Sequence, residues 1–98
     1  MLLKIVYKPH LTIRLEQRKI PRDYPQKIIL KPEHQYFDSL TKHYLSIKKL
    51  KYAGKQKNMV AVYDIINSET QVITIYPIAG SEIKNKVNSG RWKTYEKN

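Results

Sequence analysis

The apolar positions of the first thirty residues change from a short continuous run to helical spacing. Residues 2–7 form an apolar run that a proline soon closes, which is typical of a short strand. Leu11 and Leu15 then lie four residues apart, as do Tyr24 and Ile28, and this spacing places each pair on one side of a helix. We therefore expect one strand and two helices, over residues 2–7, 10–19 and 23–30.

From residue 34 onward, β-branched and aromatic residues dominate, and Gly, Asn and Ser mark the turns between them. The imperfect alternation of apolar and polar positions from His43 to Tyr52 is typical of a strand with one face in water. Ser81 and the pair Ser89-Gly90 suit the two ends of a last helix. The expected elements are four strands, over residues 34–38, 43–52, 59–66 and 70–78, with turns at 53–58 and 67–69 and a helix at 82–88.

This order of elements predicts a single α+β domain over residues 1–98. Because helices come first and strands follow, we expect two N-terminal helices packed on one face of a four-stranded, or slightly larger, antiparallel sheet, with a short C-terminal helix. The last residues, 94–98, are expected to fray. A chain of 98 residues holds one modest core and has no room for separate cofactor and substrate domains.

Positive charge is the strongest compositional feature of the chain. Nineteen basic residues face eight acidic ones, which gives a net charge of +11. Residues 39–63 contain six lysines and no acid, and residues 83–95 contain four further cations and again no acid. Such an excess indicates a polyanionic partner, and RNA is the expected one. The alternatives are a solvated lysine-rich face, an anionic membrane surface or an acidic protein. The RNA interpretation requires these lysines to gather on one surface.

The residue types that are missing exclude several functions. Without cysteine there is no disulfide and no thiolate zinc site, which favours the cytoplasm. No apolar run approaches the ~20 residues of a membrane span, and we expect no signal peptide. The three histidines lack metal-ligand spacing, and the acids Asp38, Asp64 and Glu69 are too sparse for a two-metal nuclease. We expect neither a metal nor an organic cofactor.

Two motifs resemble a known bacterial family. Residues 10–20 follow the pattern His, three residues, Arg, three residues, Arg, then Ile, and residues 72–77 read Val-Ile-Thr-Ile-Tyr-Pro. With the strand-like segments 42–44 and 60–63, they resemble the small proteins of domain of unknown function family 4258. The resemblance covers about residues 6–77. It is moderately specific, because the order and spacing of both motifs agree while either one alone is weak.

That family is similar to toxins of the RelE and barnase type. The resemblance implies a helix pair on a four-stranded antiparallel sheet and ribonuclease activity without a metal. It also implies a small acidic antitoxin as partner, with ribosome-bound mRNA as one substrate. Family members carry a Gly-Arg-rich turn where this chain has Gly54-Lys55-Gln56-Lys57. Lysine keeps the positive charge there but lacks the bidentate grip of arginine on phosphate.

Cleavage of RNA without a metal needs a base for the 2′-hydroxyl, cations for the phosphate oxygens and an acid for the leaving oxygen. His10, Arg14 and Arg18 fall on one stripe of the first helix, where two arginines favour the neutral, base-competent form of His10. We expect His10 to act as base or acid, and Arg14, Arg18 and Lys48 to stabilise the phosphate. Tyr76 is expected to stack on a base or to donate the proton. The alternative is that these side chains are solvated or contact only their neighbours.

Further RNA contacts are expected from the cations and aromatic residues of the basic segments. Arg91 and Lys93 flank Trp92, which suits phosphate contact and base stacking, and Trp92 suits an anchor for the last helix equally well. The expected RNA-binding residues are Lys42, His43, Lys49, Lys51, Lys55, Lys57, Arg91, Trp92 and Lys93. The expected function is a toxin-like, metal-independent endoribonuclease, and the alternative is a basic RNA- or DNA-binding module without catalysis.

Overall fold

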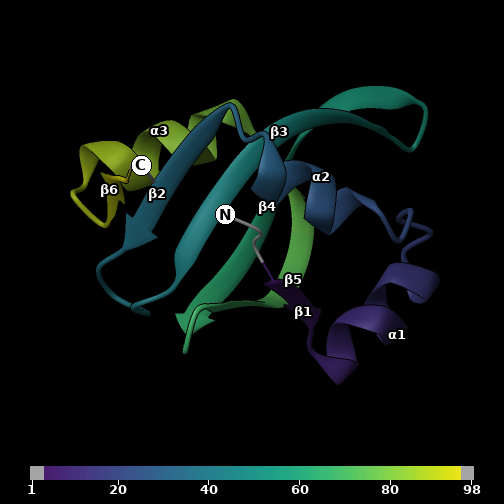
Figure 1. The fold of residues 1–98 in the computed structure, drawn as a ribbon. Helices are drawn as coiled ribbons and strands as arrows, with labels where there is room; N and C mark the ends of the chain where they lie inside the picture. The colour runs from purple at the N-terminus through teal and green to yellow at the C-terminus, as the bar shows by residue number, and fades with distance from the viewer. Residues whose placement is uncertain (1–3, 96–98) are drawn as a thin grey trace.

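A computed structural model describes residues 4–95 of the chain (Figure 1). In chain order its elements are β1 (Lys4–Tyr7), α1 (Pro9–Gln17), α2 (Tyr24–Leu30), β2 (His34–Asp38), β3 (Tyr44–Tyr52), β4 (Lys55–Ile66), β5 (Glu69–Ile78), α3 (Gly80–Asn88) and β6 (Trp92–Thr94). Residues 1–3, which include the start of the predicted first strand, lie outside the described residues. So do residues 96–98, which belong to the end that was predicted to fray. Thr94, which was also expected to fray, belongs to β6.

Across residues 4–95 the strands form one mixed sheet of six, in the order β1-β5-β4-β3-β2-β6. β1 runs parallel to β5, with Tyr7 opposite Val72, and the other neighbours are antiparallel. The α+β class holds, but the prediction of two helices on a four-stranded antiparallel sheet is wrong. The reason is that β1 and β6 pair with strands far away in the sequence, and such short strands carry little periodicity of their own.

Alternation along the central strand β4 defines the two faces of the sheet. Met59 and Ala61 point to the face that α1 and α2 cover, which we call the α1/α2 face. Val60 and Val62 point to the opposite face, which packs against α3 and which we call the α3 face. In Figure 1, α2 lies in front of the sheet and α3 behind it. The sheet is therefore covered on both faces.

The α1/α2 face holds the larger core. Leu11 and Leu15 on α1 and Ile28 on α2 are 0%, 1% and 0% exposed, and they pack in one cluster with Met59 and Ile75 of the sheet. Full burial of such a side chain is worth about 1.5–3 kcal/mol. The four-residue spacing seen in the sequence is thus the spacing of the side chains that attach both helices to the sheet.

On the α3 face, the helix packs through Ile83 and Val87, which lie four residues apart and contact the cluster around Trp92. Ala79 is the residue before the helix, with an extended backbone (ψ 146°), and no side chain caps this end. The prediction that Ser81 caps the helix is therefore wrong. The helix starts earlier because β5 ends at Ile78 and the chain turns at once.

Two tight turns bound β4, and the first of them makes this strand longer than predicted. Ala53 and Gly54 have φ of 54° and 80°, and Asn67 and Ser68 have φ of 50° and 66°. Positive φ at both central residues is the geometry of a two-residue type I′ hairpin turn, whose twist matches the flanking strands. β4 therefore begins at Lys55, and the predicted six-residue turn is too long.

Candidate nucleic-acid interface

The hairpin of β3 and β4 extends beyond the rest of the sheet. Pairing of β2 with β3 stops at Ile47, and pairing of β5 with β4 stops at Asn58. Within the described chain, the residues between these two positions pair only with each other. We call residues 48–57 the basic arm, which reaches the upper right of Figure 1. It contains no acidic residue, and its cations are Lys48, Lys49, Lys51, Lys55 and Lys57.

The lysines of the basic arm alternate between the two faces. Lys49 and Lys51 point to the α3 face, whereas Lys48, Lys55 and Lys57 point to the α1/α2 face. The expectation that these lysines gather on one surface is therefore wrong, because they divide between the two faces of the arm, and Lys42 lies in the distant β2–β3 turn. Lys49 and Lys51 on one face and Lys55 on the other are exposed, whereas Leu50 and Tyr52 pack against the larger core.

Two tyrosines attach the basic arm to the ends of the helices on the α1/α2 face. Tyr52 Oη donates a hydrogen bond to the carbonyl oxygen of Arg18 at 2.9 Å. Tyr24 Oη donates to the carbonyl oxygen of Lys51 at 2.6 Å. Both bonds join residues far apart in the sequence, so they determine where the arm lies relative to α1 and α2.

We expect Tyr24→Phe and Tyr52→Phe each to loosen the basic arm without unfolding the domain. Each variant loses one hydrogen bond to a backbone carbonyl, a loss of about 1 kcal/mol. Amide hydrogen exchange should become faster across residues 48–57 and stay unchanged in β5. Tyr36→Phe is the matched control, because Tyr36 stacks on Trp92 on the opposite face. Unchanged exchange in the arm of both variants would show that the tyrosines do not hold it.

Backbone carbonyls at the helix ends meet the basic arm at two places, that of Arg18 near the tip and that of Lys31 at the root. Lys48 Nζ donates to the carbonyl oxygen of Lys31 at 3.0 Å, next to the end of α2. The acidic residue Glu33 also lies at the root of the basic arm, where its Oε2 accepts a hydrogen bond from the N–H of Lys49 at 3.2 Å. The cations of the arm itself are Lys48, Lys49, Lys51, Lys55 and Lys57, and Arg18 and Lys31 contact it through their carbonyl oxygens.

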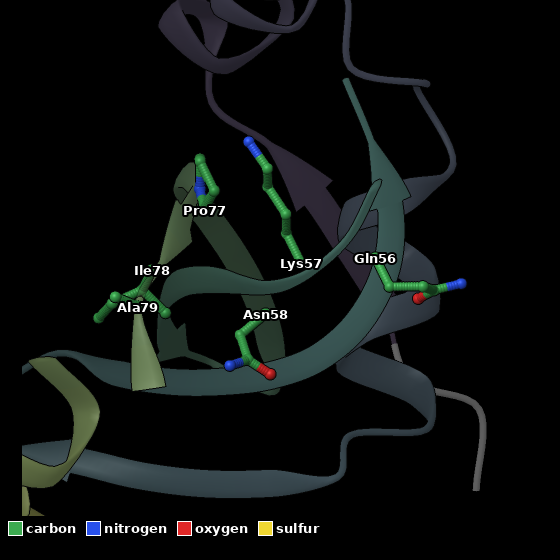
Figure 2. A pocket seen from close by; sticks show the side chains of 6 residues that line it. All are labelled: Gln56, Lys57, Asn58, Pro77, Ile78 and Ala79. Carbon is green, nitrogen blue, oxygen red and sulfur yellow. The ribbon is translucent and has the colours of Figure 1, made fainter. Parts of the chain in front are cut away.

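A hollow of about 370 Å³ lies beside the basic arm, where β5 leaves the sheet. Figure 2 shows Lys57 directed toward Pro77 on one side of β4 and Asn58 on the other side. The other lining residues are Gln56, Ile78 and Ala79. The Lys57 ammonium group and the Asn58 amide group supply hydrogen-bond donors for phosphate and ribose oxygens on the two sides of β4.

The predicted catalytic residues of α1 lie on the opposite face of the sheet from Tyr76. His10 and Arg14 are exposed, while Arg18 is half-buried and donates from Nη1 to the carbonyl oxygen of Ile75 at 3.1 Å. Ile75 lies where β1 no longer pairs with β5, so Arg18 satisfies a free edge carbonyl. Tyr76 packs on the α3 face, and burial raises its pKa. The structure therefore places the α1 stripe and Tyr76 on opposite faces, and it places Lys48 at the end of α2.

His43, predicted as an RNA contact, has a partner that the sequence did not reveal. On the α3 face its Nδ1 lies 2.7 Å from Asp64 Oδ1, and the two side chains are 34% and 30% exposed. The register explains this contact. Tyr44 lies opposite Tyr63 in antiparallel strands, so His43, which precedes Tyr44, meets Asp64, which follows Tyr63. A carboxylate at Nδ1 orients the ring and makes Nε2 the basic nitrogen.

Asp38 organises the turn after β2 and the start of β6. Its carboxylate accepts hydrogen bonds from the N–H groups of Leu40 and Thr41, from Arg91 at 3.1 Å and from Trp92 Nε1 at 3.3 Å. Burial by itself would raise the pKa of Asp38, but the bonds from Arg91, Leu40 and Thr41 outweigh it and hold the pKa well below its usual value. Trp92 is 2% exposed, which agrees with a structural anchor and leaves no ring face for a base.

The remaining predicted RNA contacts lie at the opposite end of the sheet from the basic arm. Lys42 is exposed in the turn between β2 and β3, with φ of 64°, and Lys93 is exposed on β6. The predicted RNA-binding set therefore divides into the arm lysines and a second group around the β2–β3 turn.

Among residues 4–95, no helix combines the length and apolar character needed to cross a membrane. Within the same part of the chain, no three His, Asp or Glu side chains lie close enough to share a metal ion. The functional inference therefore depends on the geometry and charge of the residues themselves. The chain matches no family model, no curated protein and no solved structure.

Proposed function

We propose that this chain is an RNA-binding domain that holds the phosphate backbone with its basic arm. The observation that carries the proposal is the concentration of five lysines, with no acid among them, on the projecting β3–β4 hairpin, which contacts the ends of α1 and α2. A two-stranded arm with lysines on both faces contacts phosphates on either side of it. The split of the lysines between the two faces suits this kind of contact.

The repulsion among these cations favours a functional surface over a solvated lysine-rich face. Like charges held close together destabilise the folded state unless a polyanion neutralises them. Here two specific hydrogen bonds, from Tyr24 and Tyr52, hold the arm against helix ends that carry Arg18 and Lys31. A chain that only needed solubility would gain stability by spreading the same charges apart.

Titration of a fluorescent single-stranded RNA across a salt series tests this proposal. Each phosphate neutralised by a cation contributes a slope of about −0.7 to the logarithm of affinity against the logarithm of salt concentration. We expect tight binding at 50 mM salt and a steep loss of affinity by 200 mM. Absence of binding at 50 mM salt, or affinity that does not change with salt, would contradict the proposal.

A second candidate function, cleavage of the bound RNA without a metal, is supported by the pair His43–Asp64. A half-buried imidazole oriented by a carboxylate is suited to take a proton from a ribose 2′-hydroxyl. Tyr76 and Arg91 lie on the same α3 face, and the charge of Arg91 lowers the Tyr76 pKa against the larger effect of burial. The candidate catalytic residues thus differ from the α1 stripe expected from the sequence.

In this candidate reaction, His43 Nε2 takes the 2′-hydroxyl proton, while Asp64 accepts a hydrogen bond from the Nδ1–H group of His43. The 2′-oxygen attacks phosphorus, the bond from phosphorus to the 5′-oxygen breaks, and a 2′,3′-cyclic phosphate remains. Arg91, which Asp38 orients, neutralises the phosphate oxygens, and Tyr76 protonates the leaving 5′-oxygen. After cleavage His43 is protonated and Tyr76 is deprotonated, and proton exchange with water restores both groups.

We expect His43→Ala to lower the cleavage rate by about 100-fold or more, which is the usual contribution of a general base. Cleavage of an end-labelled RNA is the measurement, and a substrate with 2′-deoxyribose at the cleaved position should resist. His34→Ala is the control, because His34 is an exposed histidine on β2 that points to the same face. RNA left intact by the wild-type protein, or equal loss in both variants, would exclude His43 as the base.

A further inference from the structure

A row of side chains crosses the α1/α2 face at one level of the sheet. The paired residues are Lys93, Phe37, Tyr44, Tyr63 and Val72, on β6, β2, β3, β4 and β5. Residues directly opposite one another in antiparallel strands share a face. Val72 and Tyr63 are 0% and 2% exposed under the helices, but α1 packs mainly on β5 and α2 on β3 and β4. Tyr44 packs at the edge of that core, and Phe37 lies one strand farther from the helices, on β2.

Phe37 and Tyr44 form an aromatic cluster with Tyr95, and we call these three residues the aromatic platform. The rings of Phe37 and Tyr44 meet edge to face with centroids 5.1 Å apart, and those of Tyr44 and Tyr95 are 4.9 Å apart. Tyr95 is held in place by its N–H, which donates to the carbonyl oxygen of Gln35 at 3.0 Å. All three residues are half-buried.

We propose that the aromatic platform stacks the bases of single-stranded RNA, an inference that rests on the proposed RNA-binding function and names its substrate class. Exposed aromatic rings on a sheet bind bases through their π-faces with little sequence preference. Stacking requires an unpaired base, because a duplex hides its base faces. The platform thus selects single strands, whereas the basic arm by itself accepts any phosphate backbone.

The charges around the aromatic platform suit this ligand. Lys93 lies next to Phe37 in the same row, and Lys42 lies in the adjoining β2–β3 turn, so both are placed for the phosphates that flank a stacked base. Within residues 4–95, Asp38, which follows Phe37, and Asp64, which follows Tyr63, are engaged on the α3 face by Arg91 and His43. Among these described residues, the surface around the platform rings is therefore aromatic and cationic.

The position of the aromatic platform also allows one strand of RNA to contact both the platform and the basic arm. Lys51 follows Tyr44 by seven residues along β3, a distance of about 23 Å at roughly 3.3 Å per residue. Lys48 lies between these two residues and points to the α1/α2 face, as Tyr44 does. Proteins of this size that bind single strands contact about 4–16 nucleotides, which is enough to join the two sites.

An oligonucleotide with abasic sites tests the inference on the unmodified protein. The probes are a single-stranded 12-nucleotide RNA and the same RNA with several bases removed, compared by fluorescence anisotropy at one salt concentration. Loss of one stacked base is expected to weaken binding by about 5- to 100-fold. Equal affinity for both probes would overturn the stacking inference while leaving the basic arm in place. Failure of both probes to bind at 50 mM salt would instead overturn the proposed function.

Variants of the aromatic platform assign the effect to these residues. In Phe37→Leu and Tyr95→Leu, affinity for the intact RNA should fall to that for the abasic RNA, with no further loss on the abasic probe. Tyr36→Leu is the control, because Tyr36 is a half-buried aromatic of β2 on the other face. A platform variant that weakens both probes equally, or a control that removes the preference for bases, would contradict the assignment. Melting curves show that the compared proteins are folded.

Discussion

Replacing three lysines of the basic arm by glutamine is expected to weaken RNA binding by about 100-fold at 0.1 M salt. Three phosphate contacts lower the logarithm of affinity by about 2 for each tenfold increase in salt concentration. They therefore make binding about 100-fold tighter at 0.1 M salt than at 1 M salt. Fluorescence anisotropy across a salt series measures both the affinity and the slope. The variant replaces the exposed lysines of the arm, Lys49, Lys51 and Lys55.

The matched control changes the same net charge elsewhere on the molecule. It replaces Lys4, Lys8 and Lys84 by glutamine, which are exposed and lie outside the basic arm. We expect the control to retain most of the salt slope, because long-range attraction between separated charges is screened within about 10 Å at 0.1 M salt. If both variants lose affinity equally, net charge and not the arm determines binding, and the proposed interface is wrong.

Removal of the Asp38 carboxylate is expected to be the most destabilising single change at a polar position. Asp38 is 4% exposed and accepts hydrogen bonds from two backbone N–H groups, Arg91 and Trp92. Asp38→Asn leaves Arg91 without its carboxylate, but Arg91 is one-third exposed and water rehydrates it in part. We therefore expect a loss of about 3 kcal/mol in the free energy of unfolding at pH 7, measured by urea denaturation.

The loss should depend on pH, with a sign that follows from the lowered pKa of Asp38. A carboxylate whose pKa is lower in the folded than in the unfolded chain stabilises the fold above the unfolded value, 3.8, and this contribution disappears as pH falls toward the folded value. The difference between wild type and Asp38→Asn should thus be full at pH 7 and smaller at pH 3. A difference of equal size at both pH values would show that ionisation of Asp38 does not contribute.

An exposed aspartate with an ion pair provides the comparison for Asp38. Asp23 pairs with Lys27 at 3.1 Å, but its side chain is 58% exposed. Such surface pairs contribute about 0.5 kcal/mol or less, so Asp23→Asn should change the free energy of unfolding little at either pH. A large effect at Asp23 would indicate that general electrostatics, and not burial of the Asp38 network, sets the stability.

Several elements were predictable because their causes are local. The four-residue spacing of Leu11 and Leu15 produced α1, and β2 has the predicted bounds, His34–Asp38. Turn lengths were less predictable, because Ala53 adopts positive φ only when paired strands on both sides favour the twist of a type I′ turn. β6 was missed, since three residues carry no period and the strand exists only through its pairing with β2.

The candidate site was predictable in its charge and not in its grouping. The acid-free run of lysines marked the basic arm, but the sequence could not show that Tyr24 and Tyr52 attach it to the helices. His10 and Tyr76 looked compatible with one site and lie on opposite faces. Asp64 gained its role only when the register of β3 and β4 placed it beside His43.

The sequence by itself determined the α+β class, the amphipathic spacing of the first two helices and the strong positive charge, because each depends on residue types within a few positions. The tertiary structure alone decided the six-strand order, the face on which each side chain lies and the pairs His43–Asp64 and Asp38–Arg91. Those features depend on strand register, where a shift of one residue moves every side chain to the other face. Register is set by pairing between distant segments, which no local pattern contains.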